Sequence, residues 1–290
     1  MLFKWLAFWA LALLTAGTAS ADDTVAVLSD TSGVYMEAFT AFQERYGGKI
    51  SYFDASRKRP PIPPGVRTVV AFGSKAAAQD YPPETDLVYV MAPGFSVRRP
   101  GAKGATVKIS MLTRPDILLA GLKEVQPAMK RLRLFWRAGG YARLPEEYAA
   151  AASRAGLDIT AVKVGRDEDL PGMLREAVGR MDAFWLPPDP LLISEFTLAV
   201  FIKFSQTNGV PMYVSTKGLA QKGACASIGI GFSQLGRAAS DAVKELRAGK
   251  KLPDTVYPES RQLTLNATAA RYCNLHFRPE VISKADHYFP

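Results

Sequence analysis

Histidine and cysteine, which form zinc sites and serve as bases and nucleophiles in catalysis, are scarce in this chain. Its 290 residues contain only two histidines, His276 and His287, and two cysteines, Cys225 and Cys273. A zinc site made of histidine and cysteine needs four closely placed ligands, and only Cys273 and His276 lie near each other in the sequence. The composition therefore predicts no metal site.

Catalytic and nucleotide-binding motifs are also missing. The sequence has no G-x-S-x-G turn and no phosphate-binding loop of the form G-x-x-x-x-G-K-[ST]. Gly229-Ile230-Gly231 lacks the third glycine of a dinucleotide-binding turn. The two histidines lie outside the loops where strands are expected to end. We therefore expect a binding protein without a cofactor rather than an enzyme.

One long apolar run begins the chain. Lys4 provides a short basic region, residues 5–14 are apolar, and Ala19-Ser20-Ala21 has the small residues that signal peptidase requires. Residues 1–21 are thus predicted to be a signal peptide cleaved after Ala21, which places the mature protein in the periplasm. The alternative is an uncleaved membrane anchor.

The second most apolar stretch, residues 191–204, is interrupted by Glu195 and Lys203. A buried helix is a better interpretation of it than a membrane span, because charges are costly in a bilayer.

The net charge is positive but dispersed. There are 36 lysines and arginines against 27 acidic residues, a formal charge of +9. The groups of basic residues that stand out are Arg57-Lys58-Arg59 and the Arg131/Arg133 pair. Export from the cell argues against a nucleic-acid partner, so we interpret most of these charges as solvated surface.

Cys225 and Cys273 would enter an oxidising compartment, where disulfides persist. A disulfide between them requires close approach of their backbones, which the sequence does not establish. Two buried thiols that behave as small apolar residues remain the alternative.

Strands and helices are expected to alternate along the chain. In the first part, strands are predicted at residues 25–28, 49–53, 66–72 and 86–90. One helix is expected to end near residue 46, and a second helix is expected at residues 74–80. Residues 107–109 are expected to cross to a second lobe. There, strands are predicted at 132–136, 158–164, 183–186 and 210–214, with helices at 146–155, 170–178 and 191–208. This alternation is typical of parallel sheets with helices on both faces.

The segment that follows residues 183–186 is the most informative. That short apolar strand must end at Pro187-Pro188-Asp189-Pro190, because proline lacks the amide of the sheet ladder. Asp189 is expected to cap a helix from residue 191 to 208, which Gly209 ends. Residues 210–214 form the next strand, and Ser215-Thr216-Lys217-Gly218 follows at its carboxyl end, where open α/β sheets bind ligands.

Several sequence runs resemble one family in their order and spacing. They are Leu186-Pro187-Pro188-Asp189, residues 210–215 (VPMYVS), residues 223–229 (GACASIG), residues 232–237 (FSQLGR), residues 261–266 (RQLTLN) and, less closely, residues 71–77 (AFGSKAA). Substrate-binding proteins of ABC transporters with a type I periplasmic-binding-protein fold carry similar runs, such as "PTD", "ASD" and "ATPAA".

The resemblance implies an α/β fold of two doubly wound parallel-sheet lobes, joined by a hinge that the chain crosses several times. The first lobe would comprise residues 22–110 plus about 231–258, and the second residues 111–230 plus about 259–290. The chain would recross near residues 228–231 and 257–261.

Ligand-binding residues are expected in the loops at the strand ends, between the lobes. The candidates are Ser32, Tyr35, Ser74, Lys75, Phe95, Arg137, Tyr141, Asp189, Ser215 and Thr216. Within this set, Ser74 matches the threonine of "ATP", Asp189 the aspartate of "PTD" and Ser215 the serine of "ASD".

Three departures from the family indicate the ligand's charge. Thr216 and Gly231 stand where relatives have aspartate, and Lys75 replaces a proline. Two acidic groups are lost and one cation is gained, so an anion would find more partners than an ammonium group. The expected ligand is a small organic acid, or an aromatic or branched amino acid bound mainly through its carboxylate.

The resemblance implies a monomeric periplasmic receptor that delivers its ligand to an ABC permease in the inner membrane through transient contact. The alternative is a periplasmic sensor that presents the ligand to a membrane receptor or kinase.

Overall fold

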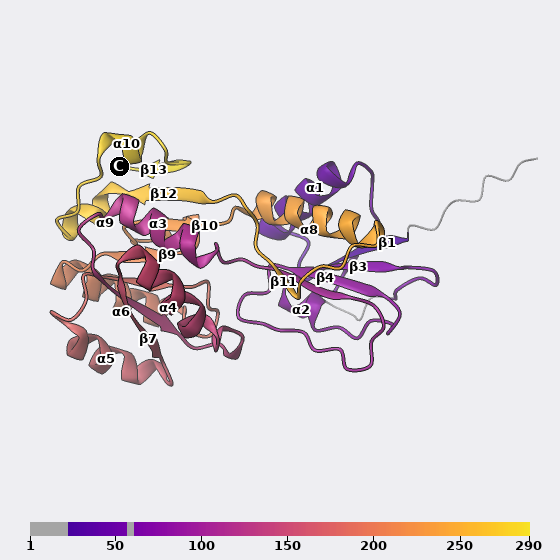
Figure 1. Ribbon diagram of the computed structural model, residues 1–290, viewed down its shortest axis with the longest axis horizontal. Coiled ribbons are helices and arrows are strands. Elements are labelled where there is room, and N and C mark those ends of the chain that lie inside the picture. Colours follow the sequence, from indigo (N-terminus) through magenta and orange to yellow (C-terminus); the bar gives the residue numbers. More distant parts are fainter. Residues whose placement is uncertain (1–22, 57–60) are drawn as a thin grey trace, which may run out of the picture.

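The computed structural model describes residues 23–56 and 61–290, which form two lobes lying end to end (Figure 1). The predicted signal peptide, residues 1–21, and the Arg57-Lys58-Arg59 cluster lie outside the described residues. Each lobe is built around one sheet.

The first lobe contains a wholly parallel sheet with the strand order β11-β5-β4-β3-β1-β2. Its strands are β1 (Thr24–Leu28), β2 (Tyr52–Asp54), β3 (Thr68–Phe72), β4 (Asp86–Val90), β5 (Thr106–Ile109) and β11 (Thr255–Val256). Helices α1 (Gly33–Tyr46) and α8 (Phe232–Arg247) pack on one face (Figure 1). The short helix α2 (Ser74–Ala77) and the proline-rich segment after residue 60 pack on the other. β1 and β3 are buried throughout, as apolar strands covered on both faces must be.

The second lobe contains a mostly parallel sheet with the order β13-β12-β10-β9-β8-β6-β7. Its strands are β6 (Arg131–Trp136), β7 (Asp158–Lys163), β8 (Ala183–Leu186), β9 (Met212–Val214), β10 (Ala226–Gly229), β12 (Gln262–Asn266) and β13 (His287–Phe289). β12 runs antiparallel to β10, and the other described pairs are parallel. The sheet therefore departs from the expected parallel order at β12.

Helices cover both faces of this second sheet. One face carries α3 (Pro115–Val125), α4 (Leu144–Ala155), α9 (Ala267–Tyr272) and α10 (Pro279–Ile282), and the other carries α5 (Leu170–Ala177), α6 (Glu195–Asn208) and α7 (Lys217–Gln221). Neighbouring residues of one strand serve both layers. Trp185 stacks on Tyr148 of α4, whereas Phe184 stacks on Phe201 of α6, with ring centroids 5.3 and 5.6 Å apart. The three-layer arrangement of helix, sheet and helix confirms the expected fold class.

The chain passes between the lobes after β5, after β10 and after β11. The prediction that residues 107–109 make the first crossing is wrong. They belong to β5, which pairs with β4 and β11, so the crossing starts at Ser110. An alternating strand gives no sign of which sheet it joins, because that depends on partners distant in the sequence.

The predicted start of the helix after β8 is also wrong. α6 begins at Glu195, and Ser194 caps it. The Ser194 hydroxyl accepts a hydrogen bond from the Thr197 amide at 3.1 Å, and the Thr197 hydroxyl accepts one from the Ser194 amide at 2.9 Å. The Asp189 carboxylate instead accepts hydrogen bonds from the amides of Leu191 and Leu192. These bonds form a turn, and the backbone there adopts this turn in place of a helix.

The two cysteines lie side by side in the second lobe. Both are buried and reduced, with their sulfur atoms 3.8 Å apart, and the Cys225 thiol donates to the Cys273 sulfur. That hydrogen bond raises the pKa of Cys225. In this structure the pair corresponds to the buried-thiol alternative.

Within residues 23–56 and 61–290, we find no helix that is both long and apolar enough to cross a membrane.

The contact between α1 and α8 predicts opposite effects for two glycine substitutions. A Cβ at Gly236 of α8 would lie 1.9 Å from the carbonyl oxygen of Ala38 in α1, whereas one at Gly172 of α5 has open space. Gly236→Ala should lower the free energy of unfolding by about 1–3 kcal/mol through overpacking. Gly172→Ala should raise it by about 0.5–1 kcal/mol, because alanine loses less backbone entropy in a helix. Urea unfolding of both variants measures this, and an unchanged Gly236→Ala protein would contradict the close helix packing.

Candidate functional site

The carboxyl ends of the parallel strands in the two lobes face each other. The loop after β4 touches the loop after β6, where the Gly140 amide donates to the Gly94 carbonyl at 3.1 Å. A side chain at Gly94, whose φ is +64°, would come within 2.6 Å of the Ala138 Cβ. Two of the strand-end loops predicted to bind ligand, those after β4 and β6, are therefore brought to the boundary between the lobes.

In the first lobe, Gly73 allows the predicted residues Tyr35 and Ser74 to lie close together. It precedes Ser74 at the end of β3, and its φ is +98°. A Cβ there would lie 2.6 Å from the Tyr35 ring and 2.4 Å from the Ser29 hydroxyl. Ser29 in turn accepts a hydrogen bond from the Ala76 amide at 2.9 Å, which fixes α2. Tyr35 is half-buried, and burial raises the pKa of its hydroxyl, so the group stays protonated and can donate a hydrogen bond.

Two further predicted residues of the first lobe are exposed. Ser32 lies at the start of α1, and both its amide and its hydroxyl donate to the Asp30 carboxylate, at 2.8 and 2.6 Å. Lys75 is exposed on α2. Phe95 lies in the loop after β4 and packs against the apolar layer on the α2 face of the sheet.

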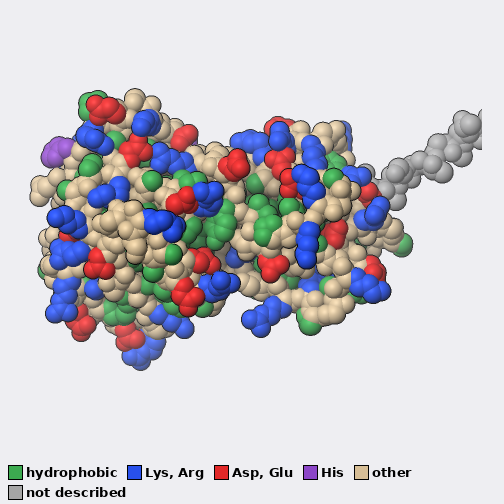
Figure 2. Space-filling view, in the orientation of Figure 1, with side chains coloured by type: hydrophobic (Ala, Val, Ile, Leu, Met, Phe, Trp, Pro, Cys, Tyr) green, Lys and Arg blue, Asp and Glu red, His purple; other side chains and the backbone are tan. Residues whose placement is uncertain are grey.

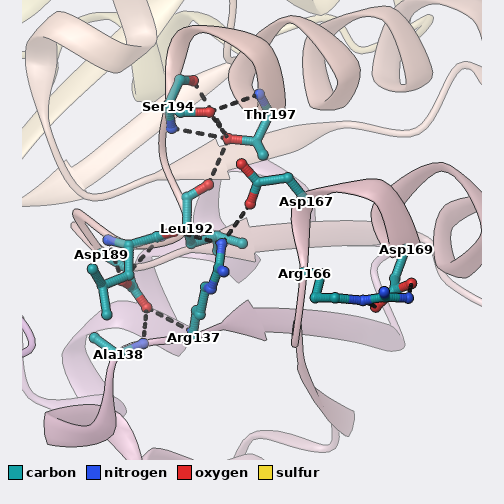
Figure 3. A network of polar contacts seen from close by, with 10 residues as sticks. Arg137, Ala138, Arg166, Asp167, Asp169, Asp189, Leu192, Ser194 and Thr197 are labelled. Carbon is teal, nitrogen blue, oxygen red and sulfur yellow. Dashed lines mark hydrogen bonds and ion pairs between the residues drawn. The ribbon is translucent and has the colours of Figure 1, made fainter.

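In the second lobe, Asp189 holds two strand-end loops together (Figure 3). It is fully buried. One carboxylate oxygen accepts from the amides of Arg137 and Ala138 at 2.7 and 2.8 Å, and the other from those of Leu191 and Leu192 at 3.0 and 3.2 Å. Asp189 therefore positions the loop after β6 and faces backbone amides of its own lobe.

The neighbouring charge is also paired within the lobe. Arg137 approaches the Asp167 carboxylate at 2.5 Å and donates to the Leu191 carbonyl at 3.2 Å (Figure 3). These contacts hold the guanidinium group close to the loop after β8. The Arg137 side chain is 30% exposed.

Two more predicted residues are buried and hydrogen-bonded to backbone. The Tyr141 hydroxyl donates to the Pro188 carbonyl at 3.3 Å, and burial raises its pKa. The Ser215 hydroxyl donates to the Leu186 carbonyl at 3.3 Å. Both fasten the β8 loop to its neighbours.

Ser74 and Thr216 differ from Ser32, Ser215 and Tyr141, whose hydroxyls are hydrogen-bonded within their own lobe. Each is half-buried at a strand end, one in each lobe. Among the described residues neither hydroxyl has a hydrogen-bond partner, and Thr216 makes no side-chain cap on α7 although it occupies the cap position. These two hydroxyls are therefore available to a ligand.

A cavity of about 690 Å³ lies beside these loops, on the hinge side. Both lobes contribute to its walls, but Tyr141 is the one predicted site residue that lines it. Sequence reasoning missed its charged residues, which are Arg98, Arg99, Lys108, Arg143, Glu147 and Asp254. Lys108 interrupts the apolar strand β5, and that interruption was the signal available in the sequence.

A family model described as "ABC transporter substrate binding protein" matches residues 116–288. Because this match covers more than half of the chain, the protein belongs to that family. Such proteins are typically periplasmic or extracellular, bind small molecules for ABC transporters and are in general not enzymes.

One curated relative is a tyrosine-binding protein from Clostridioides difficile (strain R20291). It is 24% identical over 103 residues, which are 36% of this chain and 29% of that protein. The match thus spans less than a third of the relative's length.

Solved structures share the fold at low identity. A conserved domain protein from Vibrio cholerae superposes with a TM-score of 0.62 at 16% identity, covering 91% of this chain and 99% of that one. An ABC domain from Streptococcus pneumonia in complex with L-Trp gives a TM-score of 0.60 at 16% identity, covering 92% and 100%. A ligand-free, open substrate-binding protein with adhesive properties from Clostridium difficile gives 0.61 at 16% identity, covering 91% and 98%.

The Asp189 network predicts a large loss of stability in Asp189→Ala. The substitution leaves four backbone amides of two loops without their acceptor. We expect the free energy of unfolding to fall by about 3 kcal/mol or more. Asp158→Ala, at an exposed position of β7, is the matched control and should change it by less than about 0.5 kcal/mol. Equal effects in urea unfolding would show that Asp189 does not hold the loops.

Proposed function

We propose that this protein is the solute receptor of an ABC importer and closes its two lobes on a small ligand that carries a carboxylate. The observation that carries the proposal is the pair of unbonded hydroxyls, Ser74 and Thr216, at strand-end loops of opposite lobes. A ligand that accepts a hydrogen bond from each of them would join the lobes. Binding without catalysis agrees with the general character of the family.

The charges near these hydroxyls favour an anionic group on the ligand. Lys75 adds an exposed cation directly after Ser74. The acidic residues of these loops already have partners: Asp30 accepts from Ser32, Asp189 from backbone amides, and Asp167 from Arg137. Hydrogen bonds from hydroxyls to a charged oxygen are stronger than those to a neutral one.

Aromatic amino acids are the first ligands to test. The Tyr35 ring lies against Gly73, next to Ser74, and offers a flat apolar surface to a second ring. The names of two similar proteins, a tyrosine-binding protein and an ABC domain in complex with L-Trp, support the same choice. Small organic acids and branched amino acids form the rest of the panel.

We place the receptor in the periplasm as a monomer, where it would touch the permease transiently. A sensory receptor that presents the same ligand to a membrane kinase would use the same site. Ligand uptake in cells that lack the protein distinguishes the two roles.

A ligand buried between the lobes should stabilise the folded state. At a hundredfold excess over its dissociation constant, it should add about 2.7 kcal/mol to the free energy of unfolding, because it binds the native state alone. A thermal-shift screen of amino acids and small carboxylates measures this. A panel in which only metals or nucleotides raise the melting temperature would contradict the proposed ligand class.

Substitution of the free hydroxyl should weaken binding without unfolding the protein. A hydroxyl bonded to a charged oxygen contributes about 1.5–3 kcal/mol, so Thr216→Val should raise the dissociation constant at least about tenfold. The melting temperature without ligand should stay unchanged, because the hydroxyl makes no bond within the described residues. Thr160→Val, at an exposed position of β7, is the control for calorimetry. Unchanged affinity with a lowered melting temperature would show that Thr216 serves the fold instead.

A further inference from the structure

The hinge-side cavity shares the loops after β4 and β6 with the strand-end site, but not the loops that carry Ser74 and Thr216. Its walls come from the β4–β5 loop and β5 of the first lobe, from the start of α4 in the second lobe, and from two segments at which the chain crosses, near Ser110 and Tyr257. Ser74 and Thr216 do not line it. Figure 2 shows the waist between the two lobes, with basic and acidic side chains around it. The volume of about 690 Å³ lies within the range of small-molecule sites.

Lys108 is a cation without a carboxylate partner in this cavity. Its side chain is partly buried in β5, and its ammonium group donates to the Phe95 carbonyl at 2.9 Å. No carboxylate of the described residues lies within ion-pair distance of it. Burial lowers the pKa of Lys108, and Glu147 opposes this shift. An ammonium group in this position is stabilised by any anion that enters the cavity.

Two unpaired guanidinium groups approach the same cavity from opposite lobes. Arg98 lies in the β4–β5 loop of the first lobe, and Arg143 directly precedes α4 in the second lobe. Both are exposed, and among the described residues neither guanidinium has a hydrogen bond or an ion pair. By contrast, Arg99 is anchored to the Pro82 carbonyl at 2.7 Å.

The acidic side chains of the cavity are fewer than its cations. Glu147 accepts a hydrogen bond from the Tyr257 hydroxyl at 3.3 Å, and Asp254 is exposed. Four cations thus face two carboxylates. Tyr89 and Tyr257 add hydroxyl groups, and burial raises the pKa of both, that of Tyr257 to about 12, so they remain protonated.

We propose that the hinge-side cavity binds a small organic anion with several carboxylates, held by Lys108 and Arg98 of the first lobe and by Arg143 of the second. Such an anion touches both lobes and the segments that join them. It therefore stabilises one spacing of the lobes, independently of the ligand at the strand-end loops.

The test is thermal unfolding of the whole protein with citrate as the probe, against sodium chloride of equal ionic strength. Citrate should raise the melting temperature of the unaltered protein in a saturable way. Arg143→Gln should weaken citrate binding at least about tenfold, because one charge-assisted contact is lost. Arg154→Gln, an exposed arginine at the other end of α4, is the matched control and should bind citrate normally.

Stability without citrate separates this role from a structural one. A cation next to a helix N-terminus is unfavourable, so Arg143→Gln should melt at the same temperature as the unaltered protein or slightly higher. Lys108→Met should also lose the citrate response. Because this substitution changes a partly buried side chain, the melting temperature of Lys108→Met with citrate is compared with that of the same variant without citrate.

The outcomes are distinct. Loss of the response in Arg143→Gln and Lys108→Met, with retention in Arg154→Gln and Thr216→Val, supports the proposal. Loss in Thr216→Val would place citrate at the strand-end loops and overturn it. A response no greater than that to sodium chloride, or one that Arg143→Gln and Arg154→Gln retain equally, would also overturn it. None of these results depends on the ligand proposed for the strand-end loops.

Discussion

The arrangement of the second lobe's loops depends on one buried carboxylate. Asp189 accepts four backbone amide hydrogen bonds from two loops that are about fifty residues apart in the sequence, as the 51- and 52-residue separations of two of these bonds show. Backbone amides in a buried loop need acceptors, and a single carboxylate with two oxygens supplies them all. The position of Arg137, the fold of the loop that touches the first lobe and the late start of α6 all follow from this bond set.

The lobe contact at Gly94 and Gly140 follows from the same arrangement. Asp189 fixes the backbone at Arg137 and Ala138, which places Gly140 against the Gly94 carbonyl. Glycine is needed at both positions, since a Cβ at Gly140 would lie 2.3 Å from that carbonyl oxygen. The hydroxyls of Ser74 and Thr216, which follow β3 and β9, have no hydrogen-bond partner among the described residues, and this supports the binding role proposed for them.

The fold was predictable from the sequence because buried parallel strands are short apolar runs bounded by turn residues. β4 and β8 have the predicted bounds, and the runs that resemble the family led to the correct family. The start of α6 was not predictable from the pattern, because Asp189 and Ser194 both satisfy the rule for a helix cap. Which of the two residues caps the helix is decided by the amides of Ala138 and Arg137, which lie 51 and 52 residues from Asp189 and bind its carboxylate.

The site was predictable only in part. The strand-end rule selected Ser74 and Thr216, which remain candidates, but it also selected Ser215, Tyr141 and Asp189, which the structure shows bonded to backbone. A sequence does not distinguish a polar side chain that serves its own loop from one that is free. The hinge-side cavity was missed for a related reason, since Arg98, Lys108 and Arg143 come together only when both lobes are in place.

A crystal structure of the protein with the ligand that it retains on purification tests the central claim most directly. The account predicts a small molecule whose carboxylate lies within hydrogen-bond distance of both the Ser74 and the Thr216 hydroxyls. A ligand held by one lobe alone, or bound away from both hydroxyls, would contradict it.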